Sequence, residues 1–147
     1  MTKIITGKEL QEQIVKIYPD AVVDWDNSNV WIDPNMLKQV AVLLNQEDSL
    51  DFQVLVSISA VDYIEYFELV YRLLSMRKNH SGTVKLRCYG REEIAVDSVV
   101  DVWKGADLQE REIWDLMGIC FEGHPNMKRI LLWEEFSGHP LRKDFVR

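Results

Sequence analysis

Three side chains with metal-binding chemistry lie close together in the last third of the sequence. Cys120 is followed by two copies of the triplet Gly-His-Pro, which contain His124 and His139. Thiolate and imidazole groups are common zinc ligands, so these three residues suit the site of a free-standing metalloenzyme. Against this hypothesis, the sequence offers no obvious fourth ligand. Gly123 and Pro125 also oppose the helix that would bring Cys120 beside His124.

A structural role for the two histidines is the alternative. A residue that precedes proline is restricted to an extended backbone, and each histidine is followed by one, Pro125 or Pro140. In such a segment, an imidazole can bond to main-chain groups that have no helix or sheet partner. On this hypothesis His124 and His139 fix two rigid bends in the chain. The residues alone leave both hypotheses open.

Other kinds of catalytic site find little support in the sequence. It contains no G-x-S-x-G, G-x-G-x-x-G or P-loop motif, which argues against a serine nucleophile and a nucleotide site. Cys120 lies in the apolar stretch 118–121, which is expected to raise its pKa and make it unreactive. Neighbouring carboxylates such as Glu110 and Glu112 are more typical of solvated or salt-bridged surfaces than of acid–base catalysis.

Composition and charge narrow the class of protein. The chain has 147 residues, of which 47% are hydrophobic and 28% charged, as in one ordinary globular domain. The net charge of −7 argues against nucleic acid as a partner. The two cysteines form no Cys-x-x-Cys pair, which favours reduced thiols in a cytosolic compartment. We expect no signal peptide and no membrane-spanning segment.

Capping residues mark the starts of the expected helices. Thr6 and Glu9 form a capping box, and Asp33 is a good N-cap before Pro34. The expected helices are 7–17, a second with apolar positions over 36–44, and a third that starts at 107–110 and ends at Gly118, with a further helix start at 98–101.

Alternating apolar and polar residues predict a sheet. The expected strands are 52–58, 67–73 and 84–88, with short strands at 21–25 and 30–32. Turn residues at 79–82 predict an antiparallel hairpin, with His80 in the turn. Together with the helices, these strands predict an α+β fold, with a small, mostly antiparallel sheet flanked by helices, over residues 1–118.

Residues 119–147 are expected to form an extended C-terminal strap within the same domain unit. Residues 123–147 hold five basic and three acidic residues, so the strap is basic on an otherwise acidic chain. Aromatic residues and arginine, such as Trp133, Phe136 and Arg129, are enriched at protein interfaces. A partner is therefore expected to cover the strap.

A long ordered series of residues resembles a known family. The series consists of EREIWDLMGI at 110–119, Phe121, GHP at 123–125, RIL at 129–131 and GHPLRKDF at 138–145, with VDY at 61–63 and FELVY at 67–71 upstream. It resembles the signature of the thirty-kilodalton subunit of respiratory complex I. That family includes the C subunit of bacterial NADH-quinone oxidoreductase and a chloroplast counterpart.

The resemblance implies a non-catalytic accessory subunit of a proton-translocating NADH:quinone oxidoreductase, which supports assembly of the connecting module next to the quinone site. Its partners would be the forty-nine-kilodalton-type subunit and other subunits of the hydrophilic arm. FMN, iron–sulfur clusters and quinone would lie in those partners, and no cofactor in this chain. Its position would be peripheral, on the cytoplasmic (or stromal or matrix-equivalent) side of an energy-transducing membrane, with membrane contact only through the complex.

We expect an interface, with no catalytic, cofactor-binding or metal residue in this chain. A charged helix face would lie where body and strap meet, with Arg111 and Asp115 spaced as an i,i+4 ion pair. Charged strap residues would contact the partner. The complete predicted set is Glu110, Arg111, Glu112, Asp115, His124, Pro125, Arg129, Trp133, Phe136, His139, Pro140, Arg142, Lys143 and Asp144.

Two alternatives remain. One is the equivalent subunit of a membrane-bound hydrogenase or of another donor:quinone dehydrogenase, which would differ in a donor module that this chain does not contain. The other is the free-standing metalloenzyme that would use Cys120, His124 and His139.

Overall fold

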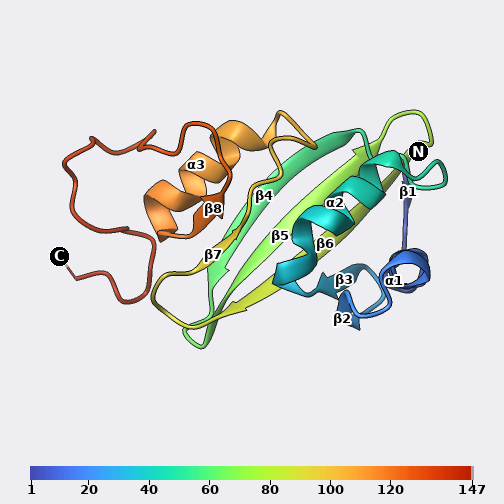
Figure 1. Ribbon diagram of the computed structural model, residues 1–147, viewed down its shortest axis with the longest axis horizontal. Helices are drawn as coiled ribbons and strands as arrows, with labels where there is room; N and C mark the ends of the chain where they lie inside the picture. Colours follow the sequence, from blue (N-terminus) through green and yellow to red (C-terminus); the bar gives the residue numbers. More distant parts are fainter. Residues whose placement is uncertain (147) are drawn as a thin grey trace.

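The computed structural model describes residues 1–146 and has an α+β fold with a mostly antiparallel sheet (Figure 1). Six strands form the main sheet, in the order β2-β3-β6-β5-β4, with β1 paired beside β6. Its strands are β1 (Lys3–Ile4), β2 (Val22–Trp25), β3 (Asn29–Ile32), β4 (Val54–Asp62), β5 (Tyr66–Ser75) and β6 (His80–Tyr89). Only β1 and β3 run parallel to β6. The expected fold class is therefore confirmed.

Three helices and a second, small sheet complete the fold. The helices are α1 (Gly7–Ile17), α2 (Leu37–Gln46), which follows the 3-10 turn η1 (Pro34–Met36), and α3 (Ala106–Met117). The small sheet pairs β7 (Ala95–Asp97) with β8 (Cys120–Glu122) in parallel. No helix among residues 1–146 is both long and apolar enough to cross a bilayer.

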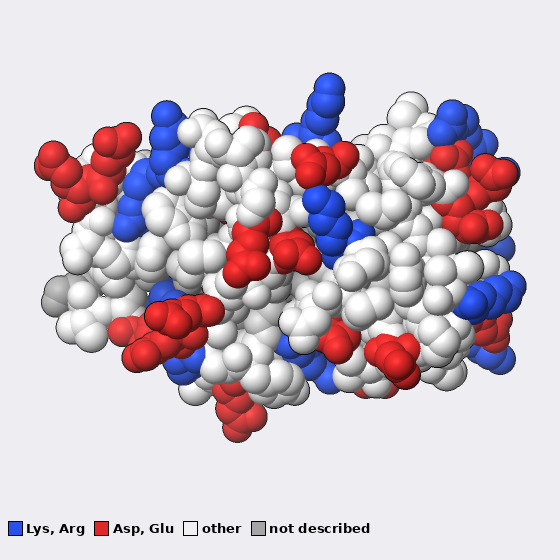
Figure 2. Space-filling model, viewed as in Figure 1, with Lys and Arg blue, Asp and Glu red and all other residues white. Residues whose placement is uncertain are grey.

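All three helices pack on the same face of the main sheet. Alternate residues of β5, including Phe67, Leu69 and Tyr71, are buried on this face in one continuous hydrophobic core. Leu10 of α1 approaches Gly82 of β6 there, and α2 and α3 lie on the same side (Figure 1). On the helix-covered side, acidic and basic side chains are interspersed without a large patch of one sign (Figure 2). In the described part of the chain, the opposite face of the sheet carries no helix.

Two local expectations from the sequence are wrong. Residues 98–101 form a turn instead of a helix start; the Ser98 hydroxyl accepts from the N–H of Val100 at 3.2 Å and donates to the buried carboxylate of Glu110 at 2.6 Å. His80 is buried at the start of β6 and is no turn residue. Its Nε2 lies 2.5 Å from the main-chain oxygen of Leu50, and its ring packs on Phe52. Each side chain thus makes a long-range contact that local sequence does not specify.

After β8, residues 123–146 contain neither helix nor strand and pass around α3 (Figure 1). The turn from α3 into β8, which leads to this segment, uses a left-handed residue at Gly118, with φ of +77°. A Cβ at Gly118 would also lie 2.7 Å from Cδ2 of His139. The predicted helix end at Gly118 is therefore confirmed, and the same glycine allows close contact with the strap.

Replacing Gly118 with alanine should destabilise the protein. A side chain in the left-handed region costs about 1–2 kcal/mol, and contact with His139 adds to this cost. Urea unfolding of the purified chain measures the change in free energy. Gly105→Ala is the control, since Gly105 has φ of −62° and the nearest contact of its added Cβ is 3.9 Å away. Equal stability of the Gly118→Ala and Gly105→Ala variants would contradict the left-handed conformation of Gly118 and its close contact with His139.

Candidate functional site

Asp115 of α3 is the residue to which the strap is anchored, and it has no exposed surface. Its Oδ1 accepts a hydrogen bond from Nη1 of Arg129 at 2.8 Å. Its Oδ2 accepts from three successive main-chain N–H groups, those of Ile130, Leu131 and Leu132, at 3.2, 2.8 and 3.0 Å. A buried charge is tolerated when it is paired and hydrogen-bonded. One stretch of the strap meets both conditions for Asp115.

The ionisation of Asp115 follows from two opposed effects. Burial by itself would raise the pKa of this carboxyl. The hydrogen bonds from Arg129 and from the three N–H groups outweigh burial, and they lower the pKa to about 2 from an ordinary 3.8. The carboxylate is therefore charged at neutral pH.

Arg129 connects this anchor to the rest of the strap. Its Nη1 also donates to the main-chain oxygen of Asp115 at 2.7 Å, and its Nη2 donates to the main-chain oxygens of Phe136 and Gly138, both at 2.8 Å. The guanidinium lies over the rings of Trp114 and Phe136, 5.4 and 5.7 Å from their centres. Arg129 thus closes residues 129–138 into a loop around one largely buried cation.

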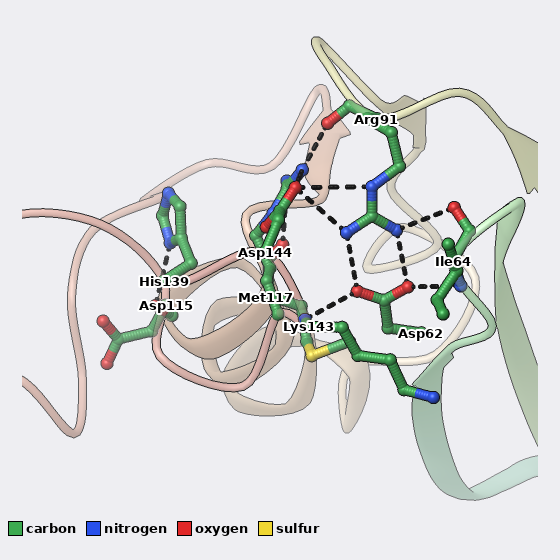
Figure 3. A network of polar contacts seen from close by, with 9 residues as sticks. Asp62, Ile64, Arg91, Asp115, Met117, His139, Lys143 and Asp144 are labelled. Atoms are coloured by element: carbon green, nitrogen blue, oxygen red, sulfur yellow. Dashed lines mark hydrogen bonds and ion pairs between the residues drawn. The ribbon is translucent and has the colours of Figure 1, made fainter. Parts of the chain in front are cut away.

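A second network fixes the end of the strap to the β4–β5 hairpin (Figure 3). The buried carboxylate of Asp62 accepts two hydrogen bonds from Arg91 at 2.5 and 2.8 Å, and one from the main-chain N–H of Lys143 at 2.9 Å. Arg91 also pairs with Asp144 at 3.0 Å, and Asp144 accepts from Nε of Arg142 at 2.9 Å. Two arginines and two aspartates therefore alternate where strap and sheet meet.

The charges of this network hold both carboxyls ionised. Hydrogen bonds from Arg91 keep the pKa of Asp62 well below its usual range, although burial opposes this effect. Hydrogen bonds from Arg142 lower the pKa of Asp144 to about 2, from an ordinary 3.8. Arg142 also donates to main-chain oxygens of Arg91 and Met117, so it joins three segments of the chain.

Both strap histidines bond to main-chain oxygens of α3. The fully buried ring of His124 places Nε2 3.0 Å from the main-chain oxygen of Asp107, while its Nδ1 accepts from the N–H of Asn126 at 3.0 Å. The proton of His124 therefore lies on Nε2. Nδ1 of His139 donates to the main-chain oxygen of Asp115 at 2.9 Å, and its ring lies edge-on to Trp114. These contacts match the structural hypothesis for the doubled triplet.

The three candidate metal ligands do not form a ligand set. Cys120 is exposed, so the expectation of an apolar environment for this thiol is wrong. Within residues 1–146, no group of three His, Cys, Asp or Glu residues is placed to hold a metal ion. The other thiol, Cys88, is buried in β6, and burial raises its pKa to about 11. This geometry gives the metalloenzyme hypothesis no site.

The other charged residues predicted on α3 take three different roles. Glu110 is buried, where its carboxylate accepts hydrogen bonds from Ser98 and Val99, and burial raises its pKa. Arg111 donates to the main-chain oxygens of Lys128 and Arg129 at 3.2 and 3.0 Å instead of pairing with Asp115. Glu112 is exposed. The helix therefore has no continuous charged face.

Three charged strap residues bond within the chain, and large apolar side chains are exposed beside the exposed charged side chains of Lys128, Glu134, Glu135 and Lys143. Arg129, Arg142 and Asp144 are used in the two networks above, although the sequence suggested contacts to a partner. Lys143 contributes its main chain, and its side chain is exposed. Pro125 is exposed, whereas Phe136 and Pro140 are half-buried. The large exposed apolar residues of the strap are Ile130, Leu131, Trp133, Leu141 and Val146.

The sequence did not indicate a site role for Asp62 or Arg91, and it indicated Ser98 only as a helix cap. A signal for Asp62 exists, because the alternation of β4 places it on the inward side, where an apolar residue is expected. A carboxylate at such a position needs a cationic partner. Arg91 lies beyond the end of β6, in an irregular segment, and no local pattern indicates that it reaches Asp62.

The sequence is similar to those of known proteins. Residues 30–147 match the family described as respiratory-chain NADH dehydrogenase, 30 Kd subunit. The C subunit of the NADH-quinone oxidoreductase of Ruegeria sp. (strain TM1040) is 41% identical over 145 residues, which cover 94% of this chain and 71% of that protein. A probable NADH-ubiquinone oxidoreductase 30.4 kDa subunit, mitochondrial, of Candida maltosa is 37% identical over 82% of this chain and 44% of its own length.

A solved structure has the same fold. It belongs to the membrane-bound sulfane sulfur reductase, an archaeal respiratory membrane complex. The TM-score is 0.76, over 95% of this chain and 85% of the other, at 24% sequence identity. At that identity the likeness concerns the fold alone.

Replacing Asp115 with asparagine should release the strap. The change removes the charge that neutralises Arg129, and breaking a buried ion pair costs about 3–5 kcal/mol. Urea unfolding measures the loss, and limited proteolysis should detect new cleavage within residues 123–146. The control is Glu112→Gln on the same helix, which should change stability by less than about 0.5 kcal/mol because Glu112 is exposed. A stable, uncleaved Asp115→Asn variant would contradict the anchoring role.

Acid should weaken the same anchor. Because the folded-state pKa of Asp115 is about 2, below the ordinary 3.8, its stabilisation is present above pH 4 and is lost as the pH falls towards 2. The difference between the folded-state and ordinary pKa of Asp115 corresponds to about 2 kcal/mol of folding free energy. Urea unfolding at several pH values should therefore give a stability gap between the wild type and Asp115→Asn that narrows from pH 5 to pH 2. A difference in stability that stays constant from pH 5 to pH 2 would show that ionisation of the Asp115 carboxyl does not stabilise the fold.

Proposed function

The chain belongs to the family of the thirty-kilodalton subunit of respiratory-chain NADH dehydrogenase, and on this premise we propose that it is a subunit of an NADH:quinone oxidoreductase. Within that complex it acts as an accessory subunit that supports assembly of the connecting module beside the quinone site. It docks there through residues 123–146 of the strap, onto the forty-nine-kilodalton-type subunit. FMN, iron–sulfur clusters and quinone are bound by partner subunits.

One observation carries the docking proposal. The strap is held to the body through Arg129, which pairs with Asp115, and through the main-chain N–H of Lys143, which bonds to Asp62, and it leaves large apolar side chains in solvent. Leu131 is 61% exposed and Trp133 is 65% exposed. Exposed apolar groups of this kind, on a segment held in place by buried ion pairs, are typical of protein interfaces.

The order of the strap supports a docking surface that exists before the partner binds. A flexible segment loses conformational entropy when it binds, which lowers its affinity. Here Asp115 already fixes the backbone of residues 130–132, and Arg129 fixes that of Phe136 and Gly138. Most of the conformational entropy of the strap is therefore lost when the chain folds, and little remains to be lost when the partner binds.

A second candidate is the equivalent subunit of a membrane-bound hydrogenase or another donor:quinone dehydrogenase. The observation in its favour is that this chain shares its fold with a chain of the archaeal sulfane sulfur reductase. That protein is a respiratory membrane complex, and its name gives sulfane sulfur, not quinone, as the substrate. In either case we propose a peripheral location, on the cytoplasmic or matrix-equivalent side, with the membrane reached through partner subunits.

Substitutions on the outer surface of the strap should weaken docking without unfolding the chain. With Leu131→Ser and Trp133→Ala combined, recovery of the forty-nine-kilodalton-type subunit with a tagged copy from solubilised membranes should fall at least tenfold, because large apolar anchors dominate interfaces. Ile17→Ser is the matched control, since Ile17 is 55% exposed on α1, away from the strap.

The same experiment separates the two candidates. Recovery of a forty-nine-kilodalton-type subunit together with NADH-oxidising subunits supports the proposal, whereas a hydrogenase-type large subunit supports the second candidate. If the wild-type chain recovers neither from membranes, the subunit role is contradicted.

A further inference from the structure

The main sheet has one face that no helix of residues 1–146 covers, and we call it the open face. It is formed by the outward-pointing residues of β3, β5 and β6. The register places Trp31 beside Lys85, Arg87 opposite Glu68, and Tyr89 opposite Tyr66. Paired residues on adjacent strands lie on the same side of a sheet, so these side chains form one surface. These residues alternate with the core residues of β5 and β6 that face α1, α2 and α3, so this surface lies on the side of the sheet away from the helices.

Aromatic and cationic side chains are stacked along the open face. The rings of Tyr63, Tyr66 and Tyr89 follow one another, each 5.2 Å from the next between centres. The guanidinium of Arg87 lies between Tyr66 and Trp31, 5.9 and 4.7 Å from their ring centres. Tryptophan, tyrosine and arginine are the residue types most enriched among binding hot spots. All three occur on this surface in direct contact.

The cations of the open face have no carboxylate partner in the described part of the chain. Within residues 1–146, Arg72, Lys85 and Arg87 form no ion pair. Nε of Arg87 is buried and has no hydrogen-bond acceptor there. Four other arginines are paired, namely Arg77 with Asp51, Arg91 with Asp62, Arg129 with Asp115 and Arg142 with Asp144, whereas Arg111 bonds to main-chain oxygens. On a chain with a net charge of −7, unpaired cations gathered on one face indicate an acidic occupant.

A cavity beside Arg87 adds an apolar feature. It measures about 170 Å³, and its lining consists of apolar and aromatic residues together with Arg87 and one acidic residue, namely Val23, Trp31, Ile32, Asp33, Pro34, Arg87 and Tyr89. This volume lies below the roughly 300–1,000 Å³ of typical small-molecule sites. It therefore suits one large side chain of a partner, placed next to the guanidinium.

We propose that the open face docks an acidic segment of a neighbouring subunit, which inserts an apolar side chain into the cavity and places carboxylates beside Arg87 and Lys85. This inference rests on the proposed subunit role but concerns a second surface, on the opposite side of the sheet from the helices. The chain would then be held between two neighbours, one at the strap and one at the open face.

An anionic lipid surface and a nucleic acid fit the open face less well. Lipid recognition by basic clusters uses about 4–8 Lys or Arg residues, more than the three present on this face. Glu68 and Asp24 also lie on it and would repel phosphate groups. The carboxylate of Glu68 accepts from Nε1 of Trp31 at 2.7 Å and is nearly buried, so it fixes the aromatic ring of the cavity. A polypeptide with spaced carboxylates avoids this repulsion.

Carbodiimide cross-linking of the purified complex tests the inference. The reagent joins a lysine amine to a carboxylate as an amide, and the water that is lost converts the carbodiimide to its urea. We expect Lys85 to be joined to an Asp or Glu of another subunit, identified by mass spectrometry, and the product to be lost in Lys85→Ala. Lys16 is the internal control, because it is exposed on α1. Absence of a product at Lys85 in the intact complex would overturn the proposal.

Labelling of a cysteine at position 89 gives an independent measurement. In the variant Tyr89→Cys, with Cys120 replaced by serine, maleimide should react at least tenfold more slowly in the complex than in the isolated chain. Equal rates would overturn the inference. Binding of the isolated wild-type chain, but not of Lys85→Glu/Arg87→Glu, to phosphatidylserine vesicles or to single-stranded DNA would also overturn it, in favour of that ligand class.

The outcome can be separated from that of the strap proposal. If the strap variant Leu131→Ser/Trp133→Ala loses the forty-nine-kilodalton-type subunit while position 89 stays reactive in the wild-type complex, the strap proposal stands and the open-face proposal fails. If a chain with an intact open face is never recovered in a complex, the subunit role itself fails.

Discussion

The ion pair between Asp115 and Arg129 determines where the last part of the chain lies. A buried carboxylate is destabilising unless its oxygens are bonded, and it is the strap that supplies the cation and the N–H groups for Asp115. Arg129 in turn holds the carbonyl groups of Phe136 and Gly138. A segment without helix or strand is thereby given one backbone path, because its polar groups bond to a rigid helix as well as to one another.

The same arrangement separates the strap into two surfaces with different roles. The inward surface is polar and charged, and it includes the Arg91, Asp62 and Asp144 network at its end (Figure 3). The outward surface carries Leu131 and Trp133, which the body of the protein does not cover. Charge thus specifies the fold of the strap, and apolar area is left for docking. An accessory subunit can act in this way without a reactive group of its own.

Local sequence signals predicted the helices and strands, but they did not predict the polar contacts between residues far apart in the sequence. The Thr6 cap, the alternation of β5 and the left-handed Gly118 each depend on neighbouring residues alone, and the structure agrees with them. The Ser98 hydroxyl accepts a local bond from the N–H of Val100, but it also donates to Glu110 twelve residues later, and no helix starts there. The partners of Asp115 and Asp62 depend on the path of the strap, which periodicity does not specify. Charged strap residues consequently suggested contacts to a partner, although Arg129 and Arg142 bond within the chain.

Hydrogen exchange at the main-chain amides of residues 130–132 tests the central claim most directly. In the isolated chain, the account predicts slow exchange of these amides, because each donates to the buried carboxylate of Asp115. Their protection should be comparable to that of the amides at the C-terminal end of α3. Exchange at the rate of an unstructured peptide, while α3 remains protected, would show that the strap is not folded onto the body before a partner binds, and would contradict the account.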